Sequence, residues 1–516
     1  MPSKAIGLLA AVLVVGCGGG SSPPPPPPAY TDPRAIPAAC PAVVLRDGGT
    51  SPVPDPAGTC VRQVGVSGLA PVGPSVGWGW IDLGVHTVGD VVPFVVPAGT
   101  ASITLVEQEV GSFLDVVSVT FSSTPVTVPN AAVPALLTDP GGTVIYSDFV
   151  APPDDGALSL LVQESLNAQA GTLSYPNTSA ALARVGTAGV APGTWHVTVS
   201  DYAYECWLLG HQVPPPLAGV TCDLASQRSD GRYRLIVMTR PGSVVSGAAH
   251  AIPDSGSVDV AIHIVDAPTP IIQVTAAAAP TDPAMIRLAS AYAGFLANAG
   301  ICLGTVTFYD APGWARSRFG AGVSTQDDSP CGDIAQLLAT SVPGSLTLDL
   351  FLVTRFTDPA TSRGTVVGVD GAVPGPATVD GTVVSGVVVS AEDLGAGTCQ
   401  PSLDLTRCGV DRVAYVAAHE SGHYLGLYHP TESSGASFDP LSDTPRCECT
   451  GCGFTASQCD PTTGSGVGGP KCRQQKPTCS GGQNLMFWLF DPSTSVGFLS
   501  PEQGRVTRAS PLVRSP

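Results

Sequence analysis

The stretch HESGHYLGLYH, residues 419 to 429, decides both the chemistry and the fold of the second half of this 516-residue chain. On a helix, His419 and His423 are four residues apart and project from one face, with Glu420 beside them. Gly426 can take the left-handed conformation that ends a helix, so the chain can turn and bring His429 back toward the same point. Three neutral imidazoles leave the fourth position of a zinc ion to water, which is the arrangement of a catalytic site.

A shorter motif would be weak evidence for such a site. An isolated histidine is usually a hydrogen-bonded core residue, and a five-residue HExxH match often arises by accident. The residue frequencies of this chain put an accidental HExxHxxGxxH on the order of a few in a million chains of this length. We therefore interpret the pattern as a metal site, the alternative being a degenerate site that kept its ligands and lost its activity.

The residues around this motif predict alternating helices and strands. Helical spacing and capping residues predict helices, and short apolar runs bounded by turn residues predict strands. The predicted helices span residues 282–298, 333–340, 411–425 and 499–506, and the predicted strands span 302–310 and 346–356. A glycine-rich edge follows at 365–390. Such alternation predicts an α/β (α+β) layer with an active cleft beneath its edge strand, near residues 382–390.

The first half of the chain has a different pattern, of short runs rich in Val, Thr and Ser between Gly, Pro, Asn and Asp. This spacing is typical of an antiparallel β-sandwich. The segment ALLTDPGGTVIYS, residues 135–147, predicts a hairpin that turns at residues 139–142. The expected fold is therefore multidomain, an N-terminal all-β sandwich followed by the α/β domain. The expected boundaries are 1–16 for a signal peptide, 17–60 for a Pro/Gly/Ser-rich linker, 61–266 for the sandwich and 267–516 for the metal-binding domain.

The N-terminus has the features of an export signal. Lys4 precedes an apolar run, residues 5–15, that is too short to span a bilayer. The run ends in VVGC, which resembles a bacterial lipobox with Cys17 as the lipid-attachment residue. Gly18 after it resembles the outer-membrane sorting pattern, so we expect an outer-membrane lipoprotein of a bacterial cell envelope or an extracellular protein. An ordinary secretory signal with an incidental Cys17 is the alternative.

Composition and charge agree with a location outside the cytoplasm. Charged residues make up only 12% of the chain, and the formal net charge of −18 argues against nucleic acid or anionic lipid as a partner. We therefore expect contact with a membrane only through the lipid anchor. The sequence does not determine the oligomeric state.

The chain contains 15 cysteines, so 14 remain for disulfides once Cys17 is assigned to lipid. Their spacing favours local pairs: Cys40 with Cys60, Cys206 with Cys222, Cys302 with Cys331, and Cys399 with Cys408. Six more lie between Cys447 and Cys479 and allow 15 connectivities. Four of these could instead form a second zinc site, but disulfides are the preferred interpretation for an exported chain.

The motif HESGHYLGLYH resembles the HExxHxxGxxH of metzincin metallopeptidases, whose second hallmark is a methionine turn under the zinc. Met486, in QNLMF, lies downstream as that family requires, and a methionine that only fills the core is the alternative. Residues 442–445, the cysteine-rich loop and the helix LSPEQGRV resemble the pappalysin or cytophagalysin branch. The resemblance covers roughly residues 268 to 510. Trp488 departs from the tyrosine that several metzincins have two residues after the methionine, and its indole N–H lacks the acidity and reach of that tyrosine.

The resemblance implies a zinc metalloendopeptidase that acts on proteins or peptides. His419, His423 and His429 would hold the ion, and Glu420 would act as the general base toward zinc-activated water. Related pappalysins bind calcium near the cleft, which makes Asp439 and Asp443 candidate calcium ligands, with surface carboxylates as the alternative. A competing function is an adhesion or carbohydrate-binding lipoprotein whose peptidase domain is secondary or inactive.

Overall fold

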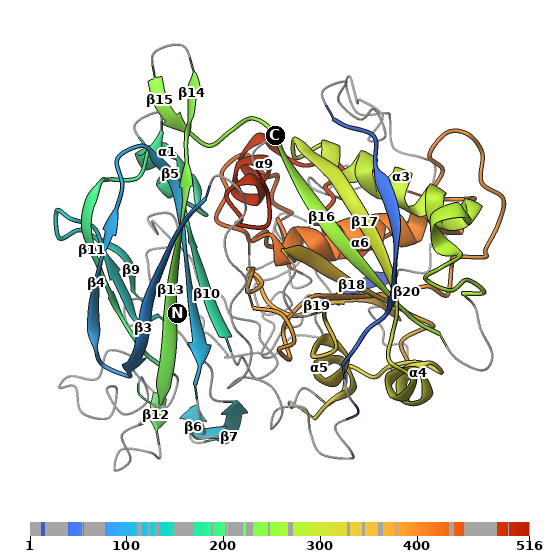
Figure 1. Cartoon of the computed structure of the whole chain (residues 1–516), viewed down its shortest axis with the longest axis horizontal. Coiled ribbons are helices and arrows are strands. Elements are labelled where there is room, and N and C mark those ends of the chain that lie inside the picture. Colours follow the sequence, from blue (N-terminus) through green and yellow to red (C-terminus); the bar gives the residue numbers. More distant parts are fainter. Residues whose placement is uncertain are drawn as a thin grey trace.

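The computed structural model describes residues 12–15, 40–53, 55, 78–110, 116–121, 124–129, 132, 134–147, 170–186, 189–201, 204, 220–222, 231–245, 248–266, 272–327, 331–342, 346–359, 365–377, 379–432, 438–447, 482–493 and 495–514. They form two lobes, a β-sandwich and a lobe of mixed helices and strands, that lie side by side in Figure 1. The expectation of a β-rich chain with several sheets is confirmed. None of the described helices combines the length and the apolar character that a membrane span requires.

The sandwich lobe consists of two four-stranded antiparallel sheets, with strand orders β10-β5-β13-β3 and β4-β11-β8-β9. The strands are β3 (Gly79–Thr87), β4 (Val91–Val96), β5 (Thr100–Glu109), β8 (Leu136–Thr138), β9 (Val144–Ser147), β10 (Ala170–Tyr175), β11 (Gly193–Thr198) and β13 (Arg232–Pro241). Smaller elements are helix α1 (Ser179–Val185), a three-stranded sheet of β6 (Val116–Phe121), β7 (Thr124–Pro129) and β12 (Val220–Cys222), and a hairpin of β14 (Ser243–Val245) and β15 (Ala248–Ala251).

Alternation of side chains along the strands builds the sandwich core. In β4, Val92, Phe94 and Val96 are buried, while the residues between them are exposed. They pack with Trp195 of the same sheet and with buried residues of the facing sheet, such as Tyr233. The predicted hairpin is confirmed, because β8 pairs antiparallel with β9 and the carboxylate of Asp139 accepts hydrogen bonds from two backbone N–H groups of the turn.

The second lobe is built on one sheet with the strand order β2-β17-β16-β18-β20-β19-β1-β21. Neighbouring strands from β2 to β20 run parallel, and β19 is antiparallel to both β20 and β1. The strands are β1 (Val12–Val15), β2 (Val44–Thr50), β16 (Gly256–Val265), β17 (Ile301–Asp310), β18 (Thr347–Val353), β19 (Thr365–Asp370), β20 (Val387–Ser390) and β21 (Leu489–Phe490). The central parallel strands β16, β18 and β20 are mostly buried, as expected when both faces are covered, whereas β2 at the edge of the sheet is mostly exposed.

Helices cover both faces of this sheet. The helices are η3 (Ala279–Thr281), α3 (Pro283–Ala297), α4 (Gly313–Phe319), α5 (Asp333–Leu338), α6 (Gly409–Tyr424) and α9 (Pro501–Arg508). Helices α3 and α6 share the main core with one face of the sheet, and α4 and α5 belong to a smaller cluster on the other face. Asp282 caps α3 by accepting from the N–H groups of Ala284 and Met285, which explains why that predicted helix begins there.

The sheet order corrects two predictions. Strands β2 and β16 lie in this large sheet, so residues 44–50 are not linker and the boundary between the lobes does not fall at residues 266–267. The predicted edge strand near residues 382–390 is also wrong. Strand β20 pairs with neighbours on both sides, and β19 is the strand that lies between it and β1.

Two disulfides join described cysteines. Cys399 pairs with Cys408, as predicted. Cys40 pairs with Cys302, which makes the predicted pairs Cys40–Cys60 and Cys302–Cys331 wrong. The pairing follows from topology, since β2 runs parallel to β17 and brings distant cysteines together. Cys17, Cys60, Cys206 and the cysteines of residues 449–479 lie outside the described residues, as does the side chain of Cys222.

Candidate metal centre

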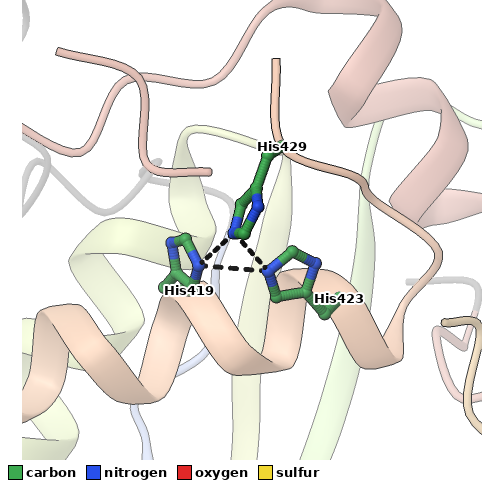
Figure 2. A group of neighbouring side chains, drawn as sticks. All are labelled: His419, His423 and His429. Atoms are coloured by element: carbon green, nitrogen blue, oxygen red, sulfur yellow. Dashed lines mark hydrogen bonds between the residues drawn. The ribbon is translucent and has the colours of Figure 1, made fainter. Parts of the chain in front are cut away.

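The three motif histidines converge at the C-terminal end of helix α6. His419 and His423 project from the last turns of the helix, as their spacing of four residues predicts. Gly426 has a φ of 105°, so the chain turns where the sequence predicts. Figure 2 shows His429 returning over the helix, with its ring directed at the other two imidazoles.

The ligand atoms have the separation that one ion requires. The Nε2 atom of His423 lies 3.1 Å from that of His419 and 3.1 Å from that of His429, and the third Nε2 separation is 3.3 Å. Two nitrogens bound to zinc at ~2.05 Å and at a tetrahedral angle lie ~3.3 Å apart. All three rings are buried. Among the described residues, this is the one group of three or more potential ligands whose atoms all lie within 4.8 Å of one another.

Hydrogen bonds at the opposite ring nitrogens fix which nitrogen faces the centre. His419 donates from Nδ1 to the carbonyl oxygen of Leu485 at 2.6 Å, and His423 donates from Nδ1 to that of Leu427 at 2.6 Å. The Nδ1 atom of His429 lies 3.0 Å from the Glu432 carboxylate. Because these oxygens can only accept, each Nδ1 carries the hydrogen. Three Nε2 lone pairs therefore face one another, and such an arrangement is stabilised by a cation.

Burial keeps the imidazoles in the neutral form that binds metals. Burial, and then His429, lower the pKa of His419 to about 3. Burial and the two neighbouring rings also hold the pKa of His423 well below its usual range. Neutral imidazoles are ligands without prior loss of a proton, so these two residues are ready to bind a cation at neutral pH.

The side chain of Glu420 projects from helix α6 toward strand β19. Its side chain is fully buried, and neither carboxylate oxygen has a hydrogen-bond partner among the residues that the structure describes. A Cβ built on Gly368 of β19 would overlap this carboxylate, so the strand passes the glutamate only because position 368 is glycine. Burial, and then the nearby carboxylate of Asp370, raise the pKa of Glu420 well above its usual range.

Met486, the residue of the predicted methionine turn, contacts helix α6 at Gly422, between His419 and His423. It is fully buried, and its N–H donates to the side chain of Asn484 at 2.8 Å. The preceding carbonyl, that of Leu485, accepts from His419. The turn therefore contributes both the apolar floor and one orienting oxygen.

The structure gives the other predicted site residues local roles. Asp443 accepts from the hydroxyl of Ser500 at 2.6 Å and from the N–H of Glu502 at 2.8 Å, so it supports the start of α9. One oxygen of Asp439 accepts from the Thr444 hydroxyl at 2.6 Å. Calcium binding by Asp439 and Asp443 stays a prediction. Trp488 is buried, and its indole N–H has no partner.

The sequence analysis missed two acidic residues of this site. Glu432 follows the third histidine by three residues, a spacing that could have indicated an orienting carboxylate. Asp370 lies at the end of β19 and carried no local signal, because its position beside Glu420 depends on how the strand crosses helix α6.

No family model matches the chain, and no curated protein matches its sequence. Among solved structures, a family two carbohydrate esterase from Clostridium thermocellum has 10% identity and a TM-score of 0.10, with 55% of this chain and 69% of that chain covered. A family two carbohydrate esterase from Cellvibrio japonicus has 9% identity and a TM-score of 0.09, with 54% and 80% covered. Scores this low carry no argument about fold or chemistry, so the metzincin resemblance rests on the residues of this chain.

Proposed function

We propose that this protein is a zinc-dependent endopeptidase of the metzincin type that hydrolyses peptide bonds of extracellular proteins. One observation carries the proposal: the Nε2 atoms of His419, His423 and His429 lie 3.1–3.3 Å apart around one point. Glu420 adjoins this group on the same helix. Three histidines with a neighbouring carboxylate are the donor set of a hydrolytic metal site.

The division of roles follows from the donor set. The three histidines would hold the ion, which supplies Lewis-acid activation of water and of the scissile carbonyl when it is bound. Glu420 accepts a proton from the attacking water at a carboxylate oxygen and later passes it to the leaving amine. The hydrogen bonds from Nδ1 to Leu485, Leu427 and Glu432 hold the rings in place during this exchange.

Strand β19 supports an extended polypeptide as the substrate. It packs against helix α6 at Gly368 and Glu420, and its outer edge pairs antiparallel with residues 12–15. If residues 1–16 are removed as a signal peptide, this edge becomes open beside the candidate catalytic glutamate. A free strand edge binds an extended peptide through main-chain hydrogen bonds, which give affinity with little side-chain selectivity.

Incubation of the protein, purified without residues 1–16 so that the β19 edge is open, with casein tests the proposal. We expect cleavage that stops with a zinc chelator and returns when zinc is added. Glu420→Gln should lower the rate by about 10²- to 10⁴-fold, since that is the usual contribution of a general base. Elemental analysis should find one zinc per chain in both proteins.

Glu392→Gln is the matched control, because Glu392 is exposed and distant in sequence from the motif. It should cleave casein at the wild-type rate. Undiminished cleavage by Glu420→Gln would show that Glu420 is not the base. Zinc binding without cleavage of any protein or peptide, combined with polysaccharide binding by the wild type, would favour the adhesion or carbohydrate-binding alternative.

A further inference from the structure

Arg240 is a buried cation between the two lobes. It lies near the end of β13, and its relative exposure is 0%. Within the described part of the chain, its Nε atom and both terminal nitrogens lack a hydrogen-bond partner. Burial of an unpaired charge costs several kcal/mol or more, so such a guanidinium calls for a counterpart.

The guanidinium of Arg240 lies over the Trp78 ring, 5.4 Å from its centroid, which is a cation–π contact that partly stabilises the charge. The hydrogen-bonding groups nearby are donors, because the indole N–H of Trp78 is buried without a partner among the described residues. Arg508 of α9 is close enough to lower the pKa of Arg240. Arg508 donates to the carbonyl oxygens of Pro253 and Ala299. Within the described ranges, Arg240 forms no ion pair with a carboxylate.

Arg240 does not avoid the cost of burying its charge by losing its proton. Burial, together with Arg508, lowers its pKa to about 10, so it stays charged at neutral pH. Glu107, on the other face of the same sheet, is also a buried ionisable group. Burial, and then Asp201, raise the pKa of Glu107 well above its usual range, which favours its neutral form. The arginine keeps its charge, and an anion is the group that would pair with it.

We propose that Arg240 and Trp78 bind a small oxyanion between the sandwich and the second lobe. A guanidinium presents two parallel N–H groups that match two oxygens of a sulfate, phosphate or carboxylate. Arg240 and Trp78 belong to the sandwich side, and Arg508 belongs to α9 of the other lobe. Arg508 already has carbonyl partners and the nearby carboxylate of Asp254, so a bound oxyanion would offset the charge of Arg240 and stabilise the contact between the lobes. This inference is independent of the proposed peptidase activity.

Thermal unfolding of the full-length protein at constant ionic strength tests the site. Sulfate, inorganic phosphate and acetate are added at low millimolar concentration, where general salt effects are small. We expect a saturable rise in Tm for the wild type, because a ligand that binds only the folded state stabilises it. The tetrahedral and the planar anions distinguish which oxyanion geometry fits. Calorimetric titration with the most effective anion should give one site per chain.

Arg240→Met should remove the response to every anion. Arg232→Met is the matched control, because Arg232 is an exposed arginine on the same strand, and it should keep the wild-type response. Trp78→Phe keeps an aromatic ring and removes the indole N–H, so its affinity should fall without loss of the site. If Arg240→Met does not fold, the calorimetric titration of the wild type and the anion affinity of Trp78→Phe test the site instead. A wild type whose Tm and titration heat show no anion dependence would overturn the proposal and indicate a guanidinium hydrated by water.

Discussion

Gly422 lies directly against Met486, and a Cβ built on Gly422 would overlap the methionine sulfur. The glycine belongs to the turn of α6 between His419 and His423, and the methionine comes from the segment that follows the cysteine-rich loop. The contact therefore holds the helix that carries two candidate ligands at a set distance from the carbonyl of Leu485, which orients His419.

We predict that Gly422→Ala destabilises the protein by up to about 2 kcal/mol. An extra methyl group in a packed core costs about 1–3 kcal/mol, and the higher helix propensity of alanine returns about 1 kcal/mol. Urea unfolding measures the net change. Gly313→Ala is the control, because a Cβ there would meet nothing within 4 Å. A Gly422→Ala variant that is more stable than the wild type by about 1 kcal/mol would show that the methionine moves aside without cost.

We predict that Glu432→Gln weakens zinc binding by about 10- to 100-fold, the usual effect of removing an orienting carboxylate behind a ligand. Its carboxylate lies 3.0 Å from Nδ1 of His429 and makes that imidazole a better ligand. Competition with a chromophoric chelator measures the affinity. Glu392→Gln should bind zinc like the wild type, and an unchanged affinity in Glu432→Gln would remove this role.

We predict that Arg287→Met destabilises the protein by about 3–5 kcal/mol, the range observed when one partner of a buried ion pair is removed. Arg287 donates to both oxygens of Asp411 at 2.7 and 2.8 Å, and the side chain of Asp411 is 0% exposed. This ion pair connects the first turn of α6, which contains Asp411, to helix α3, which contains Arg287. Chemical unfolding of Arg407→Met provides the comparison, with a loss below about 1 kcal/mol, because Arg407 is 74% exposed. Similar losses in the two variants would contradict the prediction.

We predict that stability falls between about pH 4 and pH 7 through Asp439. Burial raises the pKa of this carboxyl to about 7, although the Thr444 hydroxyl opposes the shift. The folded state therefore binds the proton more tightly than the unfolded state. The contribution is complete below about pH 4 and is lost as the pH rises through about 7. Asp439→Asn should match the wild type in Tm near pH 4 and exceed it at pH 8.

Calcium distinguishes this prediction from the predicted calcium site. If Asp439 binds calcium, the ion keeps the carboxylate charged, so calcium raises the wild-type Tm at pH 8 and Asp439→Asn loses that rise. If the wild type has a lower Tm than Asp439→Asn at pH 8 and calcium does not change that Tm, Asp439 is a carboxyl that is protonated at low pH and not a calcium ligand.

Local sequence patterns predicted the elements that depend on neighbours in the chain. The spacing of His419, His423 and Gly426 fixes the side of a helix and the place of a turn, and both lie where expected. The hairpin at Asp139 is equally local. Parallel pairing is different, because nothing near residue 44 indicates that β2 joins β17. The disulfide of Cys40, the lobe boundary and the position of Asp370 all depend on such distant pairings.

The sandwich is an insertion in the second lobe, because β2 and β16, which flank it in sequence, belong to the same sheet. A single cut in either connection would leave the two lobes joined by the other. During synthesis from the N-terminus, Cys40 emerges 262 residues before its partner Cys302. Its thiol must stay reduced, or be released from an early wrong bond, until most of the sandwich has been made, so we expect correct maturation to depend on an oxidoreductase that reshuffles disulfides.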